Sequence, residues 1–193
     1  MLLNSKIVNK GQKLVPFKLL SVDGKIVNHK ELVKKNGLVI SFICNHCPYV
    51  KDIINRIVID FNELNSLEVG TVAIMPNDVD SYPEDSYENM IIFAKENNFK
   101  FHYLYDKNQL VARDYNAVCT PDFFCFDKNN ELFYRGRLDD LKYKSKSFLS
   151  RKKDLVNAVK LNIKKGLTID NQNSSMGCSI KWKKLYYQLK EPL

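Results

Sequence analysis

Long hydrophobic segments are missing from this sequence. No run approaches the roughly 18 consecutive apolar residues that a membrane-spanning helix needs. Residues 1–12 contain no apolar core of the kind that a secretory signal peptide carries. Internal repeats and low-complexity segments are also absent. We therefore expect a cytoplasmic protein that has neither a membrane-spanning helix nor a membrane as its partner.

Cysteine is too scarce for a disulfide framework, since the chain has five cysteines, an odd number, in 193 residues. In a reducing compartment, two cysteines at close spacing indicate redox or metal chemistry before structural bridging. A second Cys-x-x-Cys pair, which would complete a zinc site, is missing. The closely spaced Cys44 and Cys47 are therefore the first candidates for chemistry.

Acidic residues are scarce in the last quarter of the chain. Residues 142–193 carry 13 Lys and Arg against 3 Asp and Glu, whereas residues 1–141 carry 17 against 19. The net charge of +8 thus arises from this quarter alone. Basic regions occur in nucleic-acid-binding proteins, but they are more often solvated surfaces. We interpret this one as a solvated face and expect no nucleic-acid partner.

The length and the hydrophobic content of the chain suffice for one domain with a sizeable core. Hydrophobic residues make up 45% of the chain and aromatic residues 11%. We place the domain at residues 1–166, with an N-terminal β-hairpin over residues 14–28 around the turn Asp23-Gly24. Residues 167–193 show no clear periodicity, and we expect them to form a C-terminal tail that docks on the domain.

Hydrophobic patterns alternate along the chain between strand and helix. Short apolar runs predict strands over residues 38–43, 71–75, 101–105, 122–126 and 131–134. Helical spacing predicts helices over residues 48–64, 81–94, 106–115 and 150–165. Ser81 and Glu84 form a capping-box pattern at the start of the second helix. This order is typical of an α/β fold with a central mixed β-sheet and helices on both faces.

The sequence Cys44-Asn45-His46-Cys47 stands where a predicted strand ends and a predicted helix begins. Pro48 suits the first turn of that helix, because its missing N–H would have no partner there. A helix N-terminus presents unpaired N–H groups and a partial positive charge, which favour the nucleophilic thiolate. His46 adds a donor or a positive charge beside the thiols. We expect Cys44 to meet solvent and attack, and Cys47 to be shielded and to resolve.

A Cys-x-x-Cys pair also fits a metal site or two inert core cysteines. A metal-binding or copper-carrying module would use Cys44, Cys47 and a histidine. His29 and His102 stand alone in the sequence, and no second ligand pair is present. Redox chemistry is therefore favoured, and we expect no metal and no other cofactor.

Four motifs spread over residues 42–182 carry a resemblance to a known family. They read Phe-Ile-Cys-Asn-His-Cys-Pro-Tyr-Val at 42–50, Val-Cys-Thr-Pro-Asp-Phe-Phe at 118–124, Tyr-Arg-Gly-Arg-Leu-Asp-Asp at 134–140 and Gly-Cys-Ser-Ile-Lys-Trp at 177–182. Together they resemble the peroxiredoxin-like thioredoxin family, the AhpC/TSA–redoxin group of the thioredoxin superfamily. The resemblance implies a thioredoxin fold in which a cis-proline loop at Thr120-Pro121 packs against the cysteine pair.

The resemblance also implies a thiol–disulfide oxidoreductase or an antioxidant thiol peroxidase. Peroxidases of the family carry Pro-x-x-x-Thr/Ser-x-x-Cys around the reactive cysteine. Counting back from Cys44 gives Ser41 at the hydroxyl position but Gly37 in place of proline; from Cys47 the same positions hold Cys44 and Ile40. This departure favours disulfide exchange over peroxide reduction. Expected partners are protein thiols and disulfides, small thiol or peroxide substrates, and a reductant protein such as a thioredoxin-type donor.

Three cysteines outside the motif and two arginines are weaker candidates. Cys119, next to the proline loop, and Cys178, in the tail, are candidate third redox thiols, with simple packing as the alternative for each. Cys125 alternates with aromatic residues on a predicted strand and is interpreted as core packing. Arg135 and Arg137 could bind an acidic substrate, but surface ion pairing is the favoured interpretation.

Overall fold

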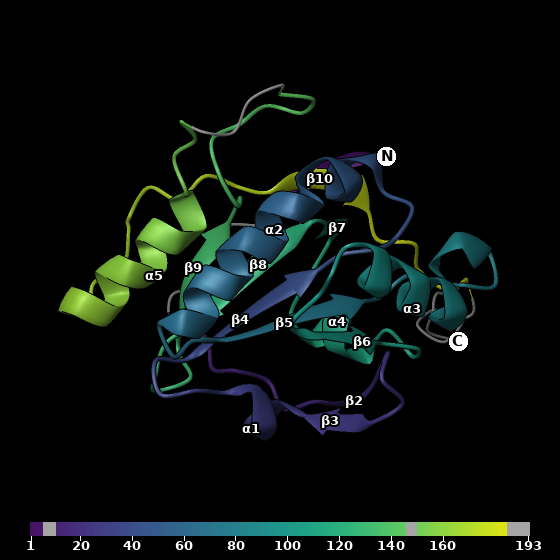
Figure 1. The fold of residues 1–193 in the computed structure, drawn as a ribbon, viewed down its shortest axis with the longest axis horizontal. Helices are drawn as coiled ribbons and strands as arrows, with labels where there is room; N and C mark the ends of the chain where they lie inside the picture. Colours follow the sequence, from purple (N-terminus) through teal and green to yellow (C-terminus); the bar gives the residue numbers. More distant parts are fainter. Residues whose placement is uncertain (6–10, 146–149, 185–193) are drawn as a thin grey trace, which may run out of the picture.

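The computed structural model describes residues 1–5, 11–145 and 150–184 (Figure 1). The end of the expected tail, residues 185–193, lies outside the described residues. Within the described ranges, no helix is both long and apolar enough to cross a membrane. The chain is organised around one central sheet with helices packed against it.

The central sheet has seven strands in the order β3-β2-β6-β5-β4-β8-β9. Their bounds are β2 (Lys18–Ser21), β3 (Ile26–Asn28), β4 (Leu38–Phe42), β5 (Gly70–Met75), β6 (His102–Tyr105), β8 (Asp122–Phe126) and β9 (Leu132–Gly136). β4, β5 and β6 are parallel, whereas the other neighbouring strands are antiparallel. The predicted mixed sheet and the hairpin of β2 and β3 are therefore confirmed.

Helices cover both faces of the sheet, as predicted. Their bounds are α1 (His29–Leu32), α2 (Pro48–Ser66), a short 3-10 helix η1 (Pro83–Asp85), α3 (Tyr87–Glu96), α4 (Leu110–Asp114) and α5 (Asp154–Lys165). α2, α3 and α5 pack on the face that carries Val39 and Phe123, and α2 crosses the sheet in Figure 1. α1 and α4 pack on the opposite face, which carries Ile40 and Phe124. Because both faces are covered, every residue of β4 and β5 is buried.

A second sheet of three strands joins both ends of the chain to its middle. β1 (Leu2–Asn4) pairs with β10 (Met176–Ser179), which pairs in turn with β7 (Cys119–Thr120). Sequence patterns did not predict these strands, because each is short and depends on a partner far away in sequence. Gly177 approaches β7 so closely that a Cβ atom there would lie 2.0 Å from the Thr120 carbonyl oxygen. Only glycine fits this position, and β10 therefore lies directly against the proline loop.

Three helices begin later than predicted, and one of them, expected from Asp106, begins at Leu110. The helix expected from Ser81 begins at Tyr87, because the side chain of Ser86, and not that of Ser81, caps its N-terminus. The residues before it form η1 instead. The helix expected from Ser150 begins at Asp154, after a segment that forms ion pairs rather than helical turns.

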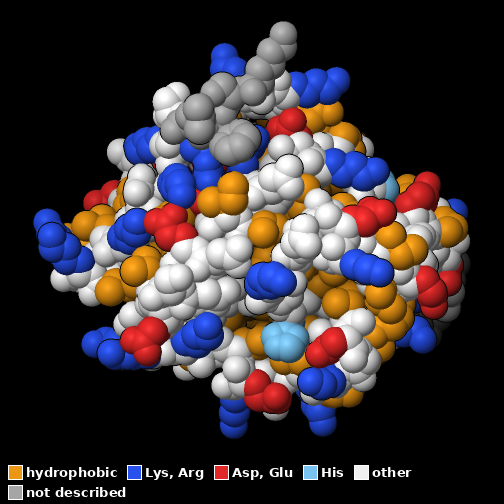
Figure 2. All heavy atoms as spheres, in the orientation of Figure 1, with side chains coloured by type: hydrophobic (Ala, Val, Ile, Leu, Met, Phe, Trp, Pro, Cys, Tyr) orange, Lys and Arg blue, Asp and Glu red, His pale blue; other side chains and the backbone are white. Residues whose placement is uncertain are grey.

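Basic residues around α5 are largely engaged with acidic residues of α2. Arg151 binds Asp60, and both Lys153 and Lys160 bind Glu63. On the face shown in Figure 2, Lys and Arg are spread over the surface with Asp and Glu among them. Acidic side chains of α2 therefore neutralise part of the basic charge of this quarter.

Candidate functional site

The Cys-x-x-Cys pair lies between β4 and α2, where the sequence predicts it. β4 ends at Phe42, and Pro48 is the first residue of α2, with Cys47 at the N-cap position. The backbone N–H of Val50, in the first turn, donates a hydrogen bond to the Cys47 sulfur. The helix therefore presents one of its unpaired N–H groups to this thiol.

The Thr120-Pro121 peptide bond is cis, as predicted, and its loop contacts both thiols. The Cys44 sulfur lies 3.3 Å from the Thr120 hydroxyl oxygen, and the Cys47 thiol donates to the Thr120 carbonyl oxygen at 3.2 Å. Both cysteines are fully buried. The prediction that Cys44 meets solvent is therefore wrong, because it considered only the position before the helix and not the cover that the distant proline loop provides.

The two thiols also differ in acidity, a difference that bears on which of them attacks. The pKa of Cys47 is lowered because the Cys44 thiol donates a hydrogen bond to its sulfur, and this effect outweighs burial. The same hydrogen bond, together with burial, raises the pKa of Cys44 well above its ordinary value. Within this pair the lower pKa lies on Cys47, although the Thr120 carbonyl oxygen, which accepts from the protonated Cys47 thiol, acts in the opposite direction.

Asp85, which sequence reasoning missed, holds the motif in place from η1. Its oxygens accept hydrogen bonds from the backbone N–H groups of Asn45 (2.7 Å) and His46 (3.2 Å), from His46 Nδ1 (2.7 Å) and from the Asn77 side chain (2.7 Å). Although burial raises it, the pKa of Asp85 lies below its ordinary value because His46 and Asn77 donate to the carboxylate. No local pattern marks this residue, since its partners are distant in sequence.

Asn45 is fixed from two sides. Its amide group donates to the Glu84 carbonyl oxygen at 3.1 Å, and its amide oxygen accepts from the buried Tyr103 hydroxyl at 2.9 Å. Together with the Asp85 carboxylate, these contacts immobilise the two residues between the cysteines. The thiols are therefore held in a preset geometry.

His46 is a half-buried titratable residue beside the cysteine pair. Its pKa is raised because its ring hydrogen-bonds Asp85, although burial acts in the opposite direction. The negative charge of Cys47 raises the pKa of His46 further. The ring also stacks on Tyr82, with centroids 5.5 Å apart. Because charge interactions are mutual, protonation of His46 stabilises the Cys47 thiolate.

We expect His46→Leu to raise the pKa of the Cys47 thiol and to make a Cys44–Cys47 disulfide less oxidising, because a group that stabilises the thiolate stabilises the reduced form. Thiolate absorbance against pH measures the first quantity, and equilibration with glutathione buffers measures the second. His102→Leu, at the start of β6, is the control and should change neither. Unchanged values for His46→Leu would show that this residue is only a spacer.

The other three cysteines differ in their relation to the pair. Cys125 is buried in β8, where burial raises its pKa, in agreement with core packing. Cys119 is buried in β7, and its thiol is directed to the Pro121 carbonyl oxygen at 3.7 Å. Cys178 is half-buried in β10, and both its thiol and its backbone N–H hydrogen-bond the Cys47 sulfur. The fold thus brings Cys178 into contact with the motif.

Both arginines around Gly136 form ion pairs. Arg135 is buried and binds Asp122 at 2.8 Å, so its pair is internal and not on the surface as favoured from sequence. Burial raises the pKa of Asp122 to about 6, because its effect is larger than the opposite effect of the Arg135 charge. Arg137 is partly exposed and binds Asp154 at 2.7 Å. Neither guanidinium is free of an acidic partner.

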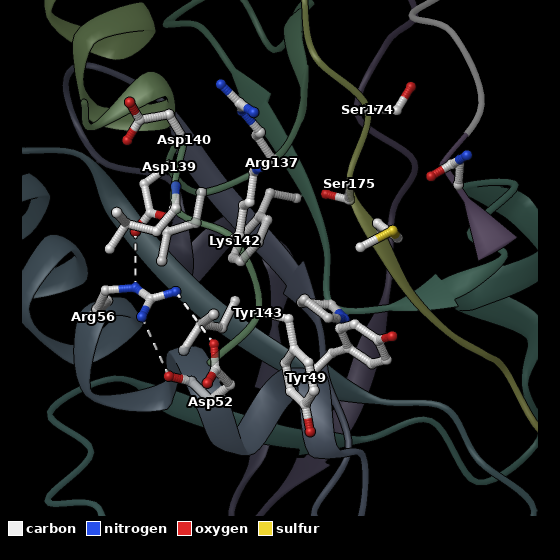
Figure 3. A pocket seen from close by; sticks show the side chains of 17 residues that line it. Tyr49, Asp52, Arg56, Arg137, Asp139, Asp140, Lys142, Tyr143, Ser174 and Ser175 are labelled. Carbon is white, nitrogen blue, oxygen red and sulfur yellow. Dashed lines mark hydrogen bonds and ion pairs between the residues drawn. The ribbon is translucent and has the colours of Figure 1, made fainter. Parts of the chain in front are cut away.

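A cavity of about 570 Å³ opens beside the cis-proline loop (Figure 3). Its lining includes Pro121, Tyr49 from the first turn of α2, and Met176 from β10. Figure 3 also shows Arg56 joined by ion pairs to the acidic residues Asp52 and Asp139. The elements that hold the thiols therefore also form the wall of this cavity.

Cys44, His46 and Asp85 form the group, among the described residues, whose geometry could hold a metal ion. Their ligand atoms all lie within 4.8 Å of one another. The metal alternative from sequence used Cys47 as the second sulfur ligand, and in the structure Asp85 takes that place. The Asp85 carboxylate already accepts a hydrogen bond from the His46 ring, which a bound ion would have to break.

Two solved structures are similar to this chain over almost its full length. An uncharacterized conserved protein from Geobacillus kaustophilus is 38% identical with a TM-score of 0.89, and covers 95% of this chain and 97% of its own. A hypothetical protein from Sinorhizobium meliloti 1021 is 31% identical with a TM-score of 0.88, and covers 94% of this chain and 98% of its own. A peroxidoxin from Mycobacterium tuberculosis, 15% identical with a TM-score of 0.55 over 65% of this chain and 83% of its own, shares the fold alone.

Family comparison agrees with the geometry of the site. No curated protein matches the chain. The AhpC/TSA family matches residues 10–135, which include the Cys-x-x-Cys pair, Asp85 and the cis-proline loop. This match spans more than half of the sequence and the greater part of the central sheet. The chain belongs to the AhpC/TSA family, with a thioredoxin-like fold.

Proposed function

We propose that this protein is a thiol–disulfide oxidoreductase whose reactive groups are Cys44 and Cys47. The observation that carries the proposal is that both sulfurs, at the N-terminus of α2, contact one residue: the Cys44 sulfur lies 3.3 Å from the Thr120 hydroxyl oxygen and the Cys47 sulfur 3.2 Å from the Thr120 carbonyl oxygen. Two thiols in contact can close a disulfide, and a thiolate stabilised by helix N–H groups is the nucleophile that exchange requires. Family membership supports the proposal, since redoxins are thiol oxidoreductases and peroxidases.

In the proposed reaction, the Cys47 thiolate attacks one sulfur of a substrate disulfide. A mixed disulfide forms, and the other substrate sulfur leaves as a thiolate and takes up a proton. Cys44 then loses its proton and attacks the Cys47 sulfur, which releases the second substrate thiol and closes the Cys44–Cys47 disulfide. Two electrons pass to the substrate, and an external dithiol, such as a thioredoxin-type donor, returns them.

The residues around the thiols have supporting roles in this proposal. Asn45 and His46, both bound to Asp85, position the pair, and Pro48 begins the helix whose N-terminus stabilises the thiolate. Thr120 contacts both sulfurs and lies next to Pro121, which lines the cavity. The cavity offers room for the part of a substrate that flanks its disulfide.

A direct test is the reduction of a peptide that contains one disulfide, with dithiothreitol as the electron donor. Catalysis by the full chain would support the proposal, and Cys125→Ala, in the core of β8, should retain that catalysis. Hydrogen peroxide consumption without disulfide reduction would overturn the proposal in favour of a thiol peroxidase. Stoichiometric metal retained after purification under reducing conditions, again without disulfide reduction, would overturn it in favour of a metal module at Cys44, His46 and Asp85.

A further inference from the structure

β10 places Cys178 at the reactive pair. In the pairing of β10 with β7, Cys178 lies opposite Thr120, whose carbonyl oxygen is 3.2 Å from the Cys47 sulfur. The absence of a side chain at Gly177 allows β10 to come this close to the loop. The position of Cys178 is therefore built by backbone pairing and by packing, and not by a mobile end of the chain.

The Cys47 sulfur stands between two other thiols. Cys178 packs against the core cluster that contains Cys44 and Cys47, and the Cys44 thiol, the Cys178 thiol and the Cys178 backbone N–H all favour negative charge on the Cys47 sulfur. Burial and the negative charge of Cys47 raise the pKa of Cys178 to about 11, although Lys181 acts in the opposite direction. Cys178 is therefore protonated at neutral pH, as a donor to the Cys47 thiolate must be.

The three thiols differ in solvent exposure. Cys44 and Cys47 are fully buried, whereas Cys178 is only half-buried. Cys119, the other cysteine near the loop, is fully buried and directs its thiol to the Pro121 carbonyl oxygen. An external thiol can therefore reach the sulfur of Cys178 more readily than that of either member of the pair.

We propose that Cys178 is a third redox thiol, which forms a disulfide with Cys47 and is the sulfur that the external reductant attacks. The proposal rests on the exchange function of Cys44 and Cys47 proposed above. It names the route by which electrons return to the buried pair.

The return of electrons proceeds in balanced steps. Cys178 loses its proton and attacks the Cys47 sulfur of the Cys44–Cys47 disulfide; that bond breaks, and Cys44 leaves as a thiolate and takes up a proton. A thiolate of an external dithiol attacks the Cys178 sulfur, which breaks the Cys47–Cys178 bond and releases the Cys47 thiolate. The second thiol of the donor then attacks its own sulfur in the mixed disulfide, so that Cys178 leaves as a thiolate and takes up a proton, while the donor becomes a disulfide.

The decisive experiment is peptide mass mapping after mild oxidation of Cys44→Ser, in which the competing partner of Cys47 is absent. We expect one internal disulfide, between Cys47 and Cys178. The further change Cys178→Ala should abolish it, whereas the matched change Cys119→Ala should leave it intact. A Cys47 that stays reduced, or that pairs with Cys119, would overturn the proposal.

Oxidation of the full chain, compared with oxidation of Cys44→Ser, distinguishes a failure of this proposal from a failure of the exchange function on which it rests. If oxidation yields a Cys44–Cys47 disulfide in the full chain but Cys44→Ser yields no Cys47–Cys178 disulfide, only the role of Cys178 is wrong. If Cys47 enters no disulfide in either protein, the proposed exchange function is wrong as well. The two failures are therefore distinguishable in one set of samples.

A rate measurement tests the second half of the proposal. The oxidised full chain and oxidised Cys178→Ala are mixed with a protein-sized dithiol, and the loss of their disulfides is followed. We expect reduction of Cys178→Ala to be slower by about tenfold or more, because exchange depends on access to the sulfur under attack. Cys178→Ser provides a second variant if the alanine variant folds poorly. Equal rates for the full chain and for a folded variant would show that the reductant does not enter through Cys178.

Discussion

Cys44→Ser should accumulate a mixed disulfide on Cys47 when it is given a disulfide substrate, and Cys47→Ser should form none. The reason is that the lowered pKa of Cys47 makes it the thiolate that attacks, while Cys44 stays protonated until it resolves. Substrate turnover by Cys47→Ser should fall to the uncatalysed rate. Cys44→Ser should complete the first step, and the mixed disulfide should persist long enough to be trapped because Cys178, whose pKa burial raises to about 11, resolves it slowly. Trapped adducts are identified by peptide mass.

The trapping experiment has a matched control and an outcome that would contradict the prediction. Cys119→Ala removes a buried thiol next to the same loop and should trap no more substrate than the unchanged protein does. If Cys47→Ser accumulates the mixed disulfide and Cys44→Ser does not, Cys44 is the attacking thiol. The thiolate assignment drawn from the hydrogen bonds would then be wrong.

Asp85→Ala should lower the free energy of unfolding by about 3–5 kcal/mol, the cost of removing one member of a buried, hydrogen-bonded charge pair. Four donors lose their partner, including the backbone N–H groups of Asn45 and His46. The change should also lower the pKa of His46, because its ring loses the hydrogen bond to the carboxylate that raises it. Chemical denaturation measures the first effect, and an NMR titration of the His46 ring measures the second.

The folding stability that Asp85 contributes should also depend on pH. Its folded-state pKa is below the ordinary value, so the stability it contributes is present above the unfolded-state pKa and is lost as pH falls through the folded-state pKa. Asp80→Ala is a matched control, since the Asp80 side chain is largely exposed and its only described ion pair, to Lys183, spans 3.8 Å. That change should stay within about 0.5 kcal/mol. An Asp85→Ala variant as stable as Asp80→Ala would contradict the positioning role.

Local patterns predicted the parts of the site that local sequence determines. The junction between β4 and α2 follows from an apolar run, two cysteines and Pro48 at a helix start, so the place of the motif was predictable. The cis bond at Pro121 followed from a family motif. Cys125 was recognised as a core residue because it alternates with aromatic side chains on a strand.

Contacts between distant segments were beyond the reach of these patterns. Asp85 acts through hydrogen bonds to residues some forty positions earlier in the chain, and nothing in η1 marks it. The burial of Cys44 depends on Thr120, and the thiol next to Cys47 arrives on β10 from the end of the chain. The wrong expectation for the exposure of Cys44 therefore has a single cause: helix position alone was used where tertiary cover decides exposure.

The most direct measurement is the ultraviolet absorbance of the thiolate, titrated against pH in the reduced protein, in Cys44→Ala and in Cys47→Ser. The unchanged protein should form a thiolate at a pH below the ordinary range for cysteine. This transition should vanish in Cys47→Ser, and it should move to higher pH in Cys44→Ala, which has no side-chain donor at position 44. A low-pH thiolate that persists in Cys47→Ser would contradict the central claim that the reactive thiolate belongs to Cys47.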